Sequence, residues 1–286
     1  MKRIIVLMLL LWGGLLSAQN LLSRSEMGIT FGGMNYLGDL NDQSMFGKVD
    51  WACGLTARIN FDSRWAMAVS GVYGHIGGGN PDVVELRNLS FRSPVLEGSI
   101  RAEFNFFPYG LIVSSQKMST PYIFCGVGLF RFNPQAKVAD PETGEAVWYD
   151  LQPLGTEGQG TSAYPERQKY QLIEVSMPFG VGYRWRISPG VHLTAEYGWR
   201  KTWTDYLDDV STTYVGAELL NGTSAGSMAA VLADRSGEVV PGYVNAVGVK
   251  RGDDALSDWY SYFNVSVTFS AEVMFGWMRG KVCEIK

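Results

Sequence analysis

Apolar residues alternate one by one with polar or small residues along four long segments of this chain. In residues 49–61 every odd position is apolar, from Val49 to Phe61, and every even position is polar or small. Successive side chains of a β-strand point to opposite faces, so this spacing predicts a strand with one apolar and one polar face. The pattern recurs in residues 95–107, 171–185 and 263–272, which favours an all-β chain.

Four weaker segments, residues 26–36, 65–75, 122–132 and 191–203, bring the number of predicted strands to eight. Each has about ten residues or more, the length that crosses a bilayer at a tilt. We therefore predict an eight-stranded antiparallel transmembrane β-barrel with a side-chain-filled lumen and long loops on one side. A soluble two-sheet sandwich is the alternative, and its strands usually have about 5–6 residues. Aromatic residues that suit membrane-interface girdles stand near the strand ends: Trp51, Phe61, Trp65, Tyr73, Phe107, Tyr109, Trp185, Trp199 and Trp259.

The first residues predict export from the cytoplasm. Lys2 and Arg3 precede an uncharged apolar run, and small residues before Gln19 suit cleavage, so residues 1–18 are interpreted as a signal peptide. The barrel domain is then expected over residues 19–273, and a periplasmic C-terminal tail over residues 274–286. Without Lys2 and Arg3 the 24 basic residues become 22, against 28 acidic ones, for a net charge of −6. This balance argues against a nucleic-acid partner.

The connections between the predicted strands alternate in length. Residues 62–64 and 187–190 are tight turns and residues 108–121 a moderate link, whereas residues 38–48, 76–94, 133–169 and 204–258 are long. Short turns on the periplasmic side and long loops outside are typical of outer-membrane barrels, so both termini are expected in the periplasm. A helix is expected in the last loop, at residues 226–233.

The inward positions predict a charged lumen. On the strand parity, four arginines face five glutamates across a barrel just wide enough for side chains to fill. Unpaired buried charge is costly, so these groups are expected to neutralise one another and to plug the lumen instead of forming a conduction path. The predicted lumen residues are Arg58, Arg101, Arg184 and Arg200, with Glu97, Glu103, Glu174, Glu196 and Glu272.

Catalytic and metal-binding patterns are missing from the sequence. His192 and Glu196 share a strand face but lie about 13 Å apart along an extended chain, too far for a hydrogen bond. His192 is interpreted as a member of the lumen network and His75, beside three glycines, as a loop residue. The three cysteines match neither a disulfide framework nor a metal-ligand spacing. We expect no enzyme activity, no metal and no cofactor.

Two acidic segments flanked by aromatic residues are expected at one rim of the barrel, where the first and seventh strands end. Gly and Asx residues there suit turns, and tyrosines suit the membrane interface. The segments also suit a partner-binding surface, or a divalent-cation site made from Asp39, Asp205, Asp208 and Asp209. The partner-binding candidates are Tyr36, Gly38, Asp39, Asn41, Asp205, Tyr206, Asp208 and Asp209.

These segments also carry a family resemblance. The chain resembles PorG, the outer-membrane β-barrel component of the type IX secretion system of the Bacteroidota. The resemblance implies membership of that protein-transport machinery. It further implies association with the periplasmic ring of the PorK lipoprotein and PorN, with outer-membrane lipid around the barrel. The matching stretches, in order, are YLGDLN (36–41), EFNFFPY (103–109), PYIFCGVG (121–128), DLQPLGTEGQG (150–160), TDYLDDVS (204–211) and DWY (258–260).

A periplasmic ring is expected to contact the short turns and the tail at residues 275–286, because the predicted topology places the rim segments on the other side. The hypothesis is therefore a structural and assembly component that anchors or stabilises the ring. Two rival functions remain open. An outer-membrane enzyme using lumen or rim carboxylates would need His192 or Asp205 within reach of another polar side chain. A passive small-solute pore would need an open lumen.

Overall fold

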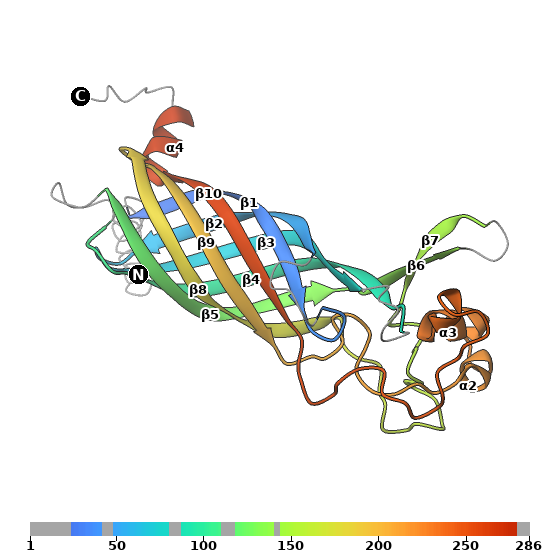
Figure 1. Cartoon of the computed structure of the whole chain (residues 1–286). Helices are drawn as coiled ribbons and strands as arrows, with labels where there is room; N and C mark the ends of the chain where they lie inside the picture. Colours follow the sequence, from blue (N-terminus) through green and yellow to red (C-terminus); the bar gives the residue numbers. More distant parts are fainter. Residues whose placement is uncertain (1–23, 42–47, 80–86, 110–117, 140–143, 279–286) are drawn as a thin grey trace, which may run out of the picture.

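The computed structural model describes residues 24–41, 48–79, 87–109, 118–139 and 144–278, with side chains up to residue 274. Eight long strands cross the molecule side by side (Figure 1). The whole of the predicted signal peptide, the end of the tail and Cys283 lie outside the described residues. The barrel strands are β1 (Ser25–Leu37), β2 (Val49–Asn60), β3 (Trp65–Gly79), β4 (Ser90–Asn105), β5 (Ser119–Phe132), β8 (Ile173–Ser188), β9 (Val191–Thr202) and β10 (Trp259–Ser270).

The eight strands close into an antiparallel barrel. Each strand pairs with its neighbours in the order β3-β2-β1-β10-β9-β8-β5-β4, and a further β3–β4 ladder joins the two ends. The last strand lies on the first from Glu26↔Ser270 to Leu37↔Trp259. Closure removes the free edges of the sheet. The predicted eight-stranded barrel is confirmed, and the sandwich alternative is wrong.

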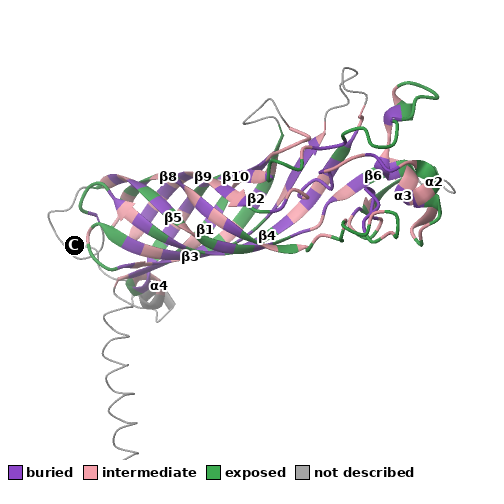
Figure 2. Ribbon diagram, turned by 90° about the horizontal axis from the view of Figure 1, so that it is seen from below, coloured by how far each residue is buried: buried purple, intermediate pink, exposed green. Residues whose placement is uncertain are grey.

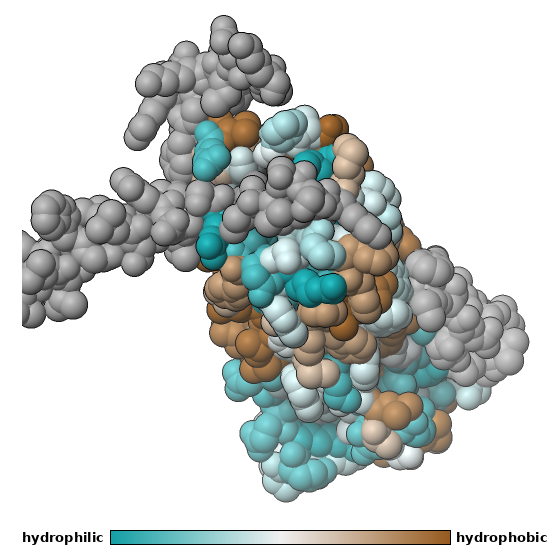
Figure 3. All heavy atoms as spheres, turned by 90° about the vertical axis from the view of Figure 1, so that its left-hand side faces the viewer, coloured by the Kyte–Doolittle hydropathy of each residue, from teal (hydrophilic) through white to brown (hydrophobic). Residues whose placement is uncertain are grey.

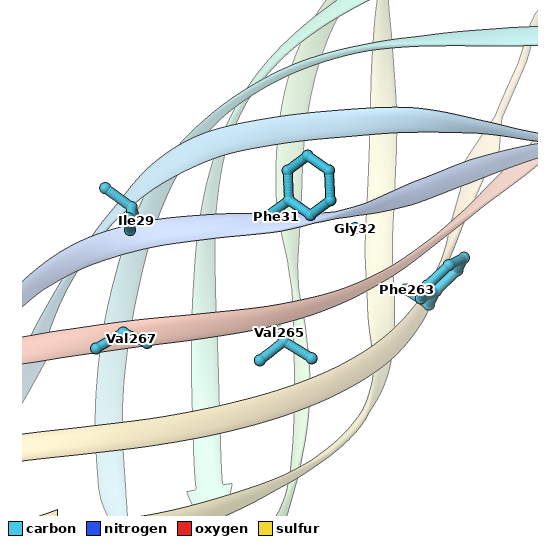
Figure 4. A pocket seen from close by; sticks show the side chains of 6 residues that line it. All are labelled: Ile29, Phe31, Gly32, Phe263, Val265 and Val267. Carbon is cyan, nitrogen blue, oxygen red and sulfur yellow. The ribbon is translucent and has the colours of Figure 1, made fainter.

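The outer wall of the barrel is apolar. Burial alternates along most of the length of the barrel strands (Figure 2), and the outward positions hold large apolar side chains such as Ile29, Phe31 and Leu55, each about two-thirds exposed. Apolar side chains gather over the visible wall, while hydrophilic ones dominate the lower part of the view (Figure 3). A hollow on the wall lies between β1 and β10, and most of the side chains that line it are apolar (Figure 4). Such a wall is suited to lipid, as in transmembrane barrels.

The two ends of the barrel differ. One end carries the short turns and the C-terminal helix α4 (Ala271–Met278), and the other carries the long connections (Figure 1). The last loop contains α2 (Ala217–Asn221), α3 (Gly226–Ala233) and the 3-10 turn η1 (Ser236–Glu238). The predicted helix at 226–233 is thus confirmed. Across the described residues, no helix has the length and apolar character to cross a membrane.

Three expectations about local structure are wrong. The loop expected over residues 133–169 holds a hairpin, β6 (Gln135–Ala139) and β7 (Ala146–Asp150), which continues the sheet beyond the barrel. His75 lies within β3, where its ring contacts Trp51 and Tyr73. Glu272 is exposed on α4 instead of facing the lumen, because β10 ends at Ser270.

Candidate functional site

The lumen on the short-turn side is filled by charged side chains. Glu103 is the centre of this network: Arg58 Nε and Arg184 Nη2 each donate to its Oε2 over 2.7 Å, and Arg101 Nη2 lies 3.6 Å from Oε1. Arg58 also donates to Glu26, over 3.1 Å. Glu103 is fully buried, and three guanidinium groups share its carboxylate.

A second layer of ion pairs lies deeper in the barrel. Arg101 Nη1 donates to Glu196 Oε1 over 2.8 Å, and Arg200 Nε donates to Glu97 Oε2 over 3.4 Å. Tyr260 completes the layer with a hydrogen bond to Glu97. The buried arginine and glutamate side chains on the barrel strands balance, four against four: Arg58, Arg101, Arg184 and Arg200 with Glu26, Glu97, Glu103 and Glu196.

Predicted lumen residues therefore meet in the structure, with two differences besides Glu272, which lies on α4. Glu26 belongs to the network and was not predicted, because the glycines of β1 weaken the alternation around it. Glu174 lies on the inward parity, opposite Phe130, but is half-buried, and within the described residues no ion pair joins it to an arginine.

His192 lies at the short-turn end of the lumen. Its Nδ1 shares a hydrogen bond with the Tyr109 hydroxyl, and its Nε2 is 4.0 Å from Glu26 Oε1. The side chain of His192 is fully buried. His192 therefore has a polar partner within reach, as the enzyme alternative requires. Its ring has no contact with solvent, through which a substrate would reach it.

The lumen at the loop end is apolar. A buried cluster crosses the barrel there, and Leu207 of the last loop inserts into it as a stopper. Asp258 Oδ2 accepts a hydrogen bond from the Leu207 backbone N–H over 2.9 Å, which holds the inserted residue in place. The other members of the cluster are Met34, Tyr36, Ala52, Val72, Ile76, Phe91, Val95, Phe130, Phe132, Tyr260 and Tyr262.

Tyr36 ties the end of β1 to both ends of the last loop. Its hydroxyl oxygen lies 2.6 Å from Asp208 Oδ2 and 2.7 Å from Asp258 Oδ1. A hydroxyl has one proton to donate, so the second short contact requires a proton on one of the two carboxyl groups. Burial raises the pKa of both Asp208 and Asp258, which agrees with a proton shared by the group.

Glu157 is the centre of a second network, which joins the loop over residues 151–172 to the last loop. It accepts hydrogen bonds from Arg251 Nη1, from the backbone N–H groups of Ser211 and Thr212, and from the Thr212 hydroxyl, over 2.7 to 3.0 Å. Asp209 lies next to it and accepts from Thr156 and Tyr170. We call the assembly of these two loops, residues 151–172 and 204–258, the cap.

The cap is expected to be more stable in acid than at neutral pH. Burial raises the pKa of Asp205 to about 7 and that of Asp209 to about 6, against about 3.9 in an unfolded chain. The folded cap therefore holds protons that the open state releases, and its stability falls as pH rises from about 4 through 7. Limited proteolysis within residues 204–258 should accelerate from pH 5 to pH 8.

Substitutions distinguish this effect from the pH dependence of the protease's own activity. Asp205→Asn should flatten the pH dependence, whereas Glu218→Gln on the exposed side of α2 should leave it unchanged. An Asp205→Asn variant with the full pH dependence would show that this carboxyl group is not its source.

The predicted partner-binding residues fall into two groups. Tyr36, Asp208 and Asp209 are buried, the two aspartates within the cap and Tyr36 at the end of β1, where it bonds to Asp208. Asn41 N donates to Gly38 O, and the Asn41 amide donates to Tyr36 O, so this segment is a turn as well. The half-buried candidates are Gly38, Asp39, Asn41, Asp205 and Tyr206, and for these a partner surface stays a prediction. Among the described residues no group of three or more His, Cys, Asp or Glu side chains is arranged to hold a metal ion.

Comparison with known proteins identifies a family for this chain. The family described as "Domain of unknown function (DUF6089)" matches residues 2–147. No curated protein matches. Among solved structures, OprG, an outer membrane protein of Pseudomonas aeruginosa, is 11% identical with a TM-score of 0.41, covering 86% of this chain and 95% of OprG. Neisserial surface protein A is 10% identical with a TM-score of 0.39, covering 86% and 96%. Ail of Yersinia pestis is 11% identical with a TM-score of 0.36, covering 86% and 98%.

Proposed function

The chain belongs to the DUF6089 family, and we propose that this outer-membrane β-barrel is a structural component of the type IX protein secretion machinery. The observation that carries the proposal is the filled interior. Charged layers occupy one half of the lumen and an apolar cluster with its Leu207 stopper occupies the other. A barrel whose lumen is filled in both halves is suited to act through its ends and its outer wall. This favours anchoring over the passage of solutes and over catalysis.

The proposed partner is the periplasmic ring of PorK and PorN, as the resemblance to the PorG family implies. The contact would use the short-turn end, with both termini in the periplasm. The long loops, which include the cap, would face the opposite side of the membrane.

Site-specific photo-cross-linking in intact outer membranes tests the partner and the side together. A photoreactive residue at Pro189, exposed in the β8–β9 turn, should attach PorK or PorN. The matched position at the loop end is Val244, which is 68% exposed and should give no such product. Deletion of the gene should also block cargo export and destabilise the ring. Normal export in the deletion strain, or ring products from position 244 alone, would contradict the proposal.

A further inference from the structure

Among the described residues, the β6–β7 hairpin ends in a strand edge that pairs with no further strand. β7 is the last strand of the sheet order, and β6 is its partner there. β6 in turn is attached to the barrel through a single pair, Arg92↔Gln135 on β4. The hairpin stands beyond the barrel strands at the loop end (Figure 1). A strand edge of this kind is a template for pairing with another strand.

The hairpin makes contacts on both faces although it projects. One of its faces, with Ala136, Val138 and Tyr149, packs on Leu232 and Met228 of α3. On the other face the Trp148 ring lies under the Arg92 guanidinium, at 4.3 Å, with the Lys137 ammonium at 5.9 Å. An edge fixed on both faces loses little conformational freedom when a further strand is added to it.

The hydrogen-bond phase of the hairpin shows which backbone groups point outward. Leu151 N donates to Pro134 O over 2.9 Å, so these two positions form a hydrogen-bonded pair. Hydrogen-bonded and non-hydrogen-bonded pairs alternate in an antiparallel ladder. The pairs Ala136↔Tyr149 and Val138↔Val147 therefore carry the internal bonds. Three residues of β7, Ala146, Trp148 and Asp150, direct their N–H and C=O groups to the free edge.

Charge around this edge favours a cationic partner. The last loop, residues 204–258, contains nine acidic and three basic residues, a formal charge of −6. Glu145 and Asp150 flank the exposed side chains of Val147 and Trp148, each 39% exposed. Two copies of this chain paired through β7 would place these acidic residues along one ladder, which is unfavourable.

We propose that β7 is a docking edge for an extended, cationic segment of a partner protein, which binds by adding a strand to the β6–β7 sheet. The outward amides of Ala146, Trp148 and Asp150 would supply the main-chain hydrogen bonds, and basic side chains of the partner would face the acidic last loop. This docking edge is independent of the contact with the periplasmic ring, because it lies at the opposite end of the barrel.

The test uses the full chain in lipid nanodiscs and two fluorescent ten-residue peptides, one alternating Lys and Val and one alternating Glu and Val. Ala146→Pro removes an outward N–H without removing an internal bond of the hairpin. Ala139→Pro is the matched control, because Ala139 is the cross-strand partner of Ala146 and its N–H points to the opposite edge. Fluorescence anisotropy should show Lys–Val binding to the natural protein and to Ala139→Pro, and at least about tenfold weaker binding to Ala146→Pro.

Hydrogen exchange identifies the bound edge directly. Addition of the Lys–Val peptide should protect the amides of residues 146, 148 and 150, and the Glu–Val peptide should protect none of them. Equal binding by both proline variants, or equal binding of the two peptides, would overturn the proposal. A dimer of the natural protein that Ala146→Pro abolishes would instead assign the edge to a second copy. Ring assembly should be normal in Ala146→Pro, so failure here and failure of the anchoring function are distinguishable.

Discussion

Replacement of Glu103 by alanine is expected to lower the free energy of unfolding of the barrel by about 3–5 kcal/mol, the range for breaking a buried ion pair. The carboxylate accepts from Arg58 and Arg184 and lies near Arg101, so its loss leaves excess positive charge in a lumen that is otherwise neutral. Urea unfolding in detergent micelles, followed by the electrophoretic mobility of the unheated barrel, measures the change.

Glu174→Ala is the matched control. Glu174 has the same side chain and the same inward parity, but it is half-buried near the beginning of β8. Its removal should change the unfolding free energy by no more than about 0.5 kcal/mol. A Glu103→Ala barrel as stable as this control would mean that the lumen charges are solvated and do not hold the strands together.

Replacement of Glu157 by alanine is expected to open the cap and leave the barrel intact. The carboxylate is fully buried and accepts hydrogen bonds from Arg251, from the Thr212 hydroxyl and from two backbone amides of the last loop. Its loss leaves the two amides without their acceptor and removes the charged partner of Arg251 at 3.0 Å. If this costs about 3 kcal/mol, proteolysis within residues 204–258 should accelerate on the order of 100-fold. Mass spectrometry of the fragments locates the cuts, and gel mobility reports on the barrel.

Glu166→Ala controls for the loss of a carboxylate from the same loop. The Glu166 side chain is 66% exposed and lies 3.8 Å from Arg167, an arrangement that contributes little to stability. Its proteolysis rate should match that of the natural protein. Equal rates for the two variants would place the stability of the cap elsewhere, in the Leu207 stopper or the Tyr36 group.

The barrel was predictable from the sequence because strand periodicity is a local property. Each of Arg58, Arg101 and Arg184 sits at an inward position of a cleanly alternating segment, so its place in the lumen follows from counting by two. Glu26 lies in β1, where glycines interrupt the alternation of apolar and polar residues. The five-residue strands β6 and β7 are too short for alternation to distinguish them from loop.

The cap was not predictable because it depends on pairs that no local pattern connects. Glu157 and Arg251 are separated by 94 positions, and Tyr36 and Asp208 by 172. Acidic residues in Asx-rich segments suit an exposed turn as well as a buried network. Such a residue is buried only where hydrogen-bond donors from distant segments lie beside it in the folded protein. No local sequence pattern shows which donors these are.

The pairing of β1 with β10 also determines at which stage of folding the barrel can close. The Thr268–Glu26 hydrogen bond at this seam joins residues 242 positions apart, so nearly the whole chain, including the last loop, must be present before the ladder closes. Contacts between such distant residues form slowly, and unpaired strands are prone to aggregation in the meantime. A chain of this design therefore leaves the edges of β1 and β10 open to pairing with other chains until the ladder between them closes, and a slow closure favours aggregation.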